Sequence, residues 1–139
     1  MAEDKVYRLS VLLDAYRKQN LETELQYSTE LEIVASMRVE DMIDYNYHAH
    51  FGPEPNYQSV YSVIQAQGLR CSAAGENIGW ITTNDDGEAV DLIFQGFIDS
   101  PTHRANILSN TFTHWGGGFG YNNGRELTCV MVFARFVKE

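Results

Sequence analysis

Two histidines and one glutamate stand in short polar segments whose surroundings in the sequence are otherwise apolar. His50 precedes a Phe-Gly-Pro sequence, Glu76 lies between a glycine and Asn77, and His103 follows a Ser-Pro-Thr sequence. Neutral imidazoles and a carboxylate are the ligands of some catalytic zinc sites, and the same groups serve as general acids and bases. Because these residues are far apart along the chain, a shared site depends on the elements that position them.

His50 is predicted to follow a helix and to lie in a loop. Residues 30–45 read as the helix, because Thr29 and Glu32 have the spacing of a capping box, in which a hydroxyl and a carboxylate bond each other's free amides. Residues 46–58 contain a Gly-Pro pair and a second proline, which favour a loop. The apolar residues of the predicted helix recur on one face: Leu31, Ala35, Val39 and Met42.

Glu76 and His103 are expected in a turn and in a short helix, respectively. Residues 69–84 show no regular periodicity, so Glu76 is predicted to lie in an irregular segment. A helix over residues 85–97 separates it from His103. The Ser-Pro pair at 100–101 starts another helix, in which the serine caps and the proline takes the first helical position. Functional groups concentrate on such segments held by rigid elements.

The rest of the chain predicts two more helices and a closing hairpin. Residues 5–18 and 59–67 carry apolar residues at helical spacing. Residues 112–121 and 125–137 flank an Asn-Asn-Gly turn and predict two antiparallel strands. The last strand is apolar on both faces, so it should be central and covered by helices on both sides. Four glycines of the first strand indicate that another backbone or a ligand packs close to it: Gly116, Gly117, Gly118 and Gly120.

Composition and charge narrow the class of protein. The chain has 139 residues, 44% of them hydrophobic and 21% charged, which fits one domain over residues 1–139. Its formal charge of -9 disfavours nucleic acids and anionic membrane surfaces as partners. No apolar run is long enough to span a membrane. Residues 1–10 lack the basic start and apolar stretch of a signal peptide, so either the protein is cytosolic or a leader has been removed.

The two cysteines, Cys71 and Cys129, match no zinc or redox motif. The sequence is compatible with two free thiols and equally with one disulfide. A disulfide would imply an oxidising compartment.

Two motifs contain the candidate glutamate and the second histidine. They are Gly75-Glu76-Asn77-Ile78 and, at residues 100–108, Ser-Pro-Thr-His-Arg-Ala-Asn-Ile-Leu. These motifs resemble the G-E-N-I and S-P-G-H-R-x-N-I-L of the bacterial branch of the CAP superfamily, whose members carry SCP/PR-1-like domains. The helix before His50 also resembles the family pattern L-x-x-x-A-x-x-R-x-x-x-M, with Arg38 as the arginine. The resemblance covers nearly the whole chain.

The resemblance implies a fold, a location and a cleft. The fold is a three-layer α/β/α sandwich with a small antiparallel sheet between helices, and the usual family member is extracellular or on the cell surface. The cleft residues that match here are His50, Glu76, Asn77 and His103. In some members this cleft holds a divalent metal, so the resemblance implies Zn²⁺ or another divalent cation on the two histidines, with Glu76 as a further ligand.

The chain also departs from the family pattern. Thr102 stands where the bacterial motif usually has glycine, and Phe97 stands where tryptophan is common. Eukaryotic relatives have a second glutamate near the end of the helix predicted over residues 85–97. In this chain only Asp99 could substitute for it. His114 is interpreted as a structural residue, and His48 as an exposed neighbour of His50.

Three functions are compatible with these residues. The resemblance favours a non-catalytic binding module for a small molecule, a lipid or a cell-envelope glycan. The alternative is a zinc-dependent hydrolase, in which the metal lowers the pKa of a bound water and Glu76 binds the metal or acts as base. A third reading is a hydrogen-bonded network that only fixes the loops. Six aromatic residues are candidates for lining a groove near the cleft: Tyr45, Tyr47, Tyr57, Tyr61, Trp80 and Trp115.

Overall fold

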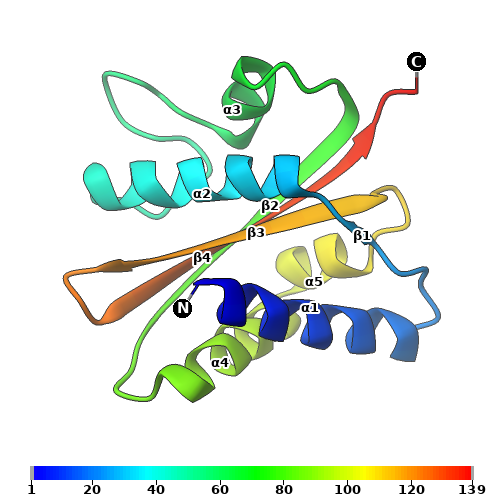
Figure 1. Ribbon diagram of the computed structural model, residues 1–139, viewed down its shortest axis with the longest axis horizontal. Helices are drawn as coiled ribbons and strands as arrows, with labels where there is room; N and C mark the ends of the chain where they lie inside the picture. The colour runs from blue at the N-terminus through cyan, green and yellow to red at the C-terminus, as the bar shows by residue number, and fades with distance from the viewer. Residues whose placement is uncertain (1, 139) are drawn as a thin grey trace.

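A twisted sheet lies between two layers of helices in the computed structural model, which describes residues 2–138 (Figure 1). Helices α2 and α3 cover one face of the sheet, and α1, α4 and α5 cover the other. This arrangement confirms the predicted three-layer α/β/α sandwich. The elements are α1 (Ala2–Gln19), β1 (Gln26–Tyr27), α2 (Thr29–Asp44), α3 (Val60–Ala66), β2 (Cys71–Thr82), α4 (Asp86–Asp99), α5 (Pro101–Leu108), β3 (His114–Asn122) and β4 (Glu126–Phe136).

The sheet has the order β1-β3-β4-β2, so β4 is paired on both sides. Its side chains alternate between the two layers. Val130, Val132 and Ala134 pack against α2 and α3, whereas Met131 and Phe133 pack in the core that includes α1, α4 and α5. The prediction of a central strand covered on both sides is therefore confirmed, because burial on both faces requires apolar residues at successive positions.

Two predictions about the sheet need correction. The sheet is mixed rather than antiparallel, because the two-residue strand β1 pairs with β3 in parallel. Residues 69–84 are not irregular, because β2 runs for 12 residues from Cys71 and pairs with β4 along its length. Glu76 therefore lies within a strand and not in a turn. The sequence did not predict β2 because it contains several glycines and alanines, which have low strand propensity.

Helices α2, α3 and α4 begin within about two residues of their predicted starts. The predicted capping box of Thr29 and Glu32 is wrong, because α2 begins at Thr29, one residue earlier than predicted, and its cap is Ser28, whose hydroxyl accepts from the Leu31 amide. α3 has a capping box formed by Ser59 and Ser62. Gly68, just after α3, has a φ of 74°, which glycine adopts without steric cost. The caps fix where α2 and α3 begin, and Gly68 fixes how the chain leaves α3.

The glycines of β3 allow α2 to approach the sheet. A Cβ atom at Gly116 would lie 2.3 Å from the backbone nitrogen of Glu32, and one at Gly118 would lie 2.8 Å from the backbone of Ala35. The prediction of close backbone packing is thus confirmed at these two positions. Because α2 carries Arg38 toward the sheet, this close approach also helps to set the position of the candidate site.

We expect Gly116→Ala to lower the free energy of unfolding by about 1–3 kcal/mol, because the added methyl group must push α2 away from β3. Gly96→Ala is the matched control, since a Cβ atom at Gly96 has no neighbour within 4 Å. In a helix interior this control should raise stability by up to about 1 kcal/mol. Urea unfolding of both variants measures the difference. Equal stabilities for the two variants would contradict this account of the packing.

The two cysteines are free thiols in the structure. Cys129 is buried in β4, and burial raises the pKa of its thiol. Cys71 is half-buried, and burial together with the nearby Glu30 raises the pKa of its thiol. Among residues 2–138, no helix has both the length and the apolar character needed to cross a membrane.

Candidate functional site

A fully buried ion pair between Arg38 and Glu76 connects α2 to β2. Arg38 Nε donates to Glu76 Oε2 at 2.7 Å, and Arg38 Nη2 donates to Glu76 Oε1 at 3.3 Å. The side chains are 0% and 1% exposed, respectively. Burial disfavours the charged guanidinium, but the hydrogen bond and the charge of Glu76 outweigh it and raise the pKa of Arg38. The guanidinium of Arg38 therefore remains charged within the protein.

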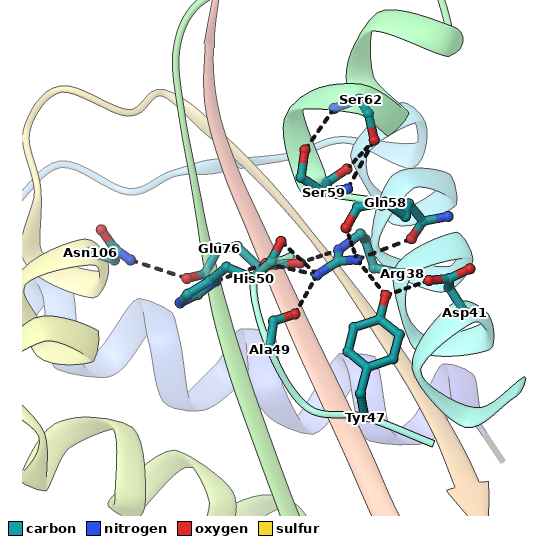
Figure 2. A network of polar contacts seen from close by, with 10 residues as sticks. All are labelled: Arg38, Asp41, Tyr47, Ala49, His50, Gln58, Ser59, Ser62, Glu76 and Asn106. Atoms are coloured by element: carbon teal, nitrogen blue, oxygen red, sulfur yellow. Dashed lines mark hydrogen bonds and ion pairs between the residues drawn. The ribbon is translucent and has the colours of Figure 1, made fainter. Parts of the chain in front are cut away.

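Arg38 also holds the loop that follows α2. Its Nη2 donates to the carbonyl oxygens of Ala49 and His50, at 2.7 and 3.2 Å. Its Nη1 donates to Tyr47 Oη at 3.0 Å and to the carbonyl and side-chain oxygens of Gln58. Figure 2 shows these contacts around the guanidinium of Arg38. A single buried side chain thus fixes both ends of the segment that carries His50.

Tyr47 extends this network to the end of α2. Its hydroxyl donates to Asp41 while it accepts from Arg38. Burial and the hydrogen bond to Asp41 raise the pKa of Tyr47 to about 12. The hydroxyl therefore stays protonated at physiological pH and remains a donor.

His50 lies at the exposed end of the same network. Its Nδ1 is 2.9 Å from Glu76 Oε1, and its side chain is 57% exposed. Because the carboxylate only accepts, we assign the proton to Nδ1 of the neutral ring, which leaves Nε2 as the acceptor. Nε2 makes no hydrogen bond among the described residues. The ring is thus held at one nitrogen and open at the other.

His103 lies in the first turn of α5, as predicted. Its Nδ1 is 2.9 Å from Ser100 Oγ, and its ring packs on Phe97 with centroids 5.2 Å apart. Burial, and then the charge of His50, lower the pKa of His103, so the two imidazoles are close enough to interact electrostatically. The prediction that the Ser100 side chain caps α5 is wrong, because its hydroxyl contacts the His103 ring and makes no cap bond.

Two asparagines attach α5 to β2. Asn77 is fully buried, and its Nδ2 donates to the carbonyl oxygen of His103 at 3.1 Å. Asn106 Nδ2 donates to Asn77 Oδ1 at 2.9 Å and to the carbonyl oxygen of Glu76 at 3.4 Å. The Asn106 contact with the Glu76 main chain is drawn in Figure 2. Asn77 therefore fixes the backbone of His103, and its own side chain is sealed from solvent.

A shallow groove of about 250 Å³ runs beside His103, between β2 and α4. Trp80 lines it and is 51% exposed. The interpretation of His48 as an exposed neighbour is wrong. His48 stacks on Trp80 with ring centroids 4.1 Å apart, and its Nε2 lies 3.1 Å from Thr128 Oγ1. Of the other aromatic candidates, Trp115 is a buried core residue and Tyr45, Tyr57 and Tyr61 are exposed.

The structure therefore places His50 against Glu76, and His103 near His50, while Asn77 lies behind them in the β2–α5 contact. The binding role of these four residues stays a prediction. Within residues 2–138, no three His, Cys, Asp or Glu side chains are grouped closely enough to hold a metal ion. The central residue, Arg38, was not among the predicted site residues. Its place on the apolar face of α2 was the available signal, because a buried cation needs an anionic partner.

Comparison with known proteins identifies the family. The model of the cysteine-rich secretory protein (CAP) family matches residues 11–133. The uncharacterized protein YkwD of Bacillus subtilis is 32% identical over 103 residues, which are 74% of this chain and 37% of that protein.

Solved structures agree with this assignment. An extracellular SCP-domain protein of Bacillus anthracis superposes with a TM-score of 0.77 at 26% identity, over 96% of this chain and 41% of that one. An outer surface protein of Borrelia burgdorferi has the same fold, with a TM-score of 0.84 at 14% identity over 99% of this chain and 100% of that one. The chain thus spans less than half the length of the two Bacillus proteins. Because the family model matches most of its residues, this chain belongs to the cysteine-rich secretory protein (CAP) family.

Proposed function

We propose that this chain is an exported, non-catalytic binding module whose cleft holds a zinc ion on His50 and His103. The observation that carries the proposal is the 2.9 Å contact between His50 Nδ1 and Glu76 Oε1, made by a ring that is 57% exposed. A carboxylate that accepts from one imidazole nitrogen is the usual outer partner of a metal-binding histidine, because it orients the ring and makes the other nitrogen more basic.

The donor set fits a labile ion completed by water rather than a closed structural site. His50 and His103 each use Nδ1 within the protein, which leaves both Nε2 atoms as ligands. Both oxygens of Glu76 accept hydrogen bonds from Arg38 or His50, so this carboxylate orients the ring instead of coordinating the ion. When bound, zinc supplies a Lewis-acidic centre with open positions for an oxygen ligand.

The geometry does not favour the hydrolase alternative. A general base must come within hydrogen-bond reach of the water that it activates. The Glu76 side chain is 1% exposed, and its two oxygens are already engaged by Arg38 and His50. We therefore infer that Glu76 is a positioning residue and that the module binds its ligand without chemical change.

An extracellular or cell-surface location is part of this proposal. It is supported by membership of the family and by the 26% identity to an extracellular protein over 96% of the chain. In that location the partners that suit the groove beside His103 are a small molecule, a lipid or a cell-envelope glycan. The exposed Trp80 offers an apolar surface on which such a ligand can pack.

Isothermal titration with zinc tests the proposal. We expect one zinc ion to bind per chain and to be removed by EDTA. Calcium should give no heat, because imidazole nitrogen suits zinc whereas calcium prefers oxygen ligands. A titration without heat for zinc, or with the same heat for calcium, would contradict a two-histidine site.

Glu76→Gln should lower zinc affinity about 10–100-fold, the usual effect of removing an outer partner of a metal ligand. The glutamine keeps the size of the side chain but loses the charge that orients the imidazole. Because it also weakens the contact with Arg38, the titration is run at a temperature where circular dichroism shows the variant folded. Unchanged affinity in the folded variant would show that Glu76 has no part in the site.

A further inference from the structure

A second pocket lies at the end of the sheet where β1 begins and β4 ends. Figure 1 shows these two strand ends on the same side of the molecule. Its volume is about 540 Å³, within the range of small-molecule sites. It is lined by the segment after α1, by the loop between α5 and β3, and by the last residues of β4. None of its lining residues belongs to the network of Arg38, Glu76 and His50, so it is a separate feature of the molecule.

Arg17 brings a buried positive charge to this pocket. It is 1% exposed and makes no ion pair among the described residues. Its Nε donates to the carbonyl of Thr23, and its Nη1 donates to the carbonyls of Ile107 and Ser109, at 2.7–3.0 Å. Its Nη2 makes no hydrogen bond among the described residues, and because no sealed side-chain nitrogen of residues 2–138 lacks a partner, this nitrogen is not completely enclosed.

The other charges of the pocket leave it positive in an acidic protein. Arg135 and Lys138 add two cations to Arg17, against the carboxylates of Glu22 and Glu24. Glu24 also lies near Asp14, and burial together with the charge of Glu24 raises the pKa of the Asp14 carboxyl to about 6. Arg135 donates one hydrogen bond, from Nη1 to the carbonyl of Thr111, so most of its donors are unused. Two guanidinium groups with unused donors are suited to hold a carboxylate.

Aromatic rings form much of the remaining wall. Phe112, His114 and Phe136 all line the pocket. His114 and Phe136 meet edge to face, with ring centroids 4.9 Å apart at an angle of 69°. Such rings favour a flat aromatic partner, which can stack on one ring and meet the edge of another.

We propose that this pocket binds a planar aromatic carboxylate, with its anionic group at Arg17 and Arg135 and its rings among Phe112, His114 and Phe136. The volume admits a bicyclic ring system. The neutral alternative, an aromatic alcohol, would leave the guanidinium donors without an anion, and an aliphatic acid would forgo the stacking.

Isothermal titration of the EDTA-treated protein tests this site without any contribution from zinc. The probes are naphthoate, the uncharged naphthalenemethanol and the aliphatic decanoate. The variants are Arg135→Gln and, as control, Arg125→Gln in the turn between β3 and β4. We expect naphthoate to bind one to one and at least about tenfold more tightly than either other probe, since hydrogen bonds to charged groups contribute most.

Arg135→Gln should weaken naphthoate binding about tenfold and leave naphthalenemethanol unchanged, because only the charged probe uses the guanidinium. Arg125→Gln should bind all probes like the unaltered chain. Thermal melts show whether each variant is folded. The proposal is overturned by an absence of naphthoate binding, by equal or tighter binding of the alcohol or of decanoate, or by an Arg135 variant that binds like the Arg125 control.

Discussion

Replacing Arg38 by methionine should lower the free energy of unfolding by about 3–5 kcal/mol, the usual cost of breaking a buried ion pair from one side. The side chains of Arg38 and Glu76 are 0% and 1% exposed, so the remaining carboxylate has no water to replace its partner. The carbonyls of Ala49 and His50 lose a donor at the same time. Urea denaturation followed by circular dichroism measures the change.

The chain contains a matched control for this experiment. Arg8 pairs with Asp91 at 2.8 Å, but these side chains are 48% and 44% exposed. Arg8→Met should therefore cost much less stability than Arg38→Met, because exposed ion pairs contribute little. The double variant Arg38→Met with Glu76→Leu should recover much of the loss, since a well-packed apolar pair often replaces a buried ion pair without penalty. If the Arg38 and Arg8 variants lose equal stability, the buried ion pair does not contribute more to the free energy of unfolding than an exposed pair, which contradicts this account.

Replacing His50 or His103 by alanine should lower zinc affinity by about 100-fold or more. The loss should exceed that of Glu76→Gln, because a direct ligand disappears rather than its outer partner. The two substitutions should also be strongly non-additive, since either one removes a shared site. Zinc titration of the single and double variants provides the measurement.

His48→Gln and His114→Asn are the controls for this second prediction. His48 is stacked on Trp80, and His114 is hydrogen-bonded to Thr113 at the other pocket. Neither should change zinc affinity by more than a few-fold, provided that the variant remains folded. If zinc affinity falls as far with a control substitution as with His103→Ala, the ion binds elsewhere.

The layers of the fold could be predicted from the sequence because each depends on a local pattern. Apolar periodicity predicted where α2, α3 and α4 begin to within about two residues. The apolar run of β4 indicated a strand buried on both faces. The Asn-Gly turn was equally informative, since Asn123 and Gly124 both have the positive φ that tight hairpin turns require.

Strand β2, which carries Glu76, could not be predicted, because its small residues are required by contacts with segments that are distant in the sequence. A Cβ atom at Gly79 would lie 2.9 Å from the side chains of Ile93 and Phe97 on α4. One at Gly75 would lie 2.9 Å from Phe112. These glycines allow helices and loops to pack on β2, and they also remove the strand propensity on which a sequence-based prediction depends.

The contacts between side chains within the site could not be predicted either. The sequence indicated that His50, Glu76 and His103 are special, through their motifs, but it could not show that Arg38 binds the carboxylate. Nor could it show that the Ser100 hydroxyl turns to His103 instead of capping α5, because both bonds are within reach of the same side chain. Side-chain pairing depends on the register of β2 against β4 and on how closely α2 approaches the sheet.

Nitrogen-15 NMR of the histidine rings, recorded with and without one equivalent of zinc, tests the central claim most directly. Without metal, His50 should carry its proton on Nδ1, as the contact with Glu76 Oε1 at 2.9 Å requires. On addition of zinc, the Nε2 signals of His50 and His103 should shift together, and those of His48 and His114 should not. A shift confined to one of the first two rings, or shared with the second two, would contradict a metal site built on His50 and His103.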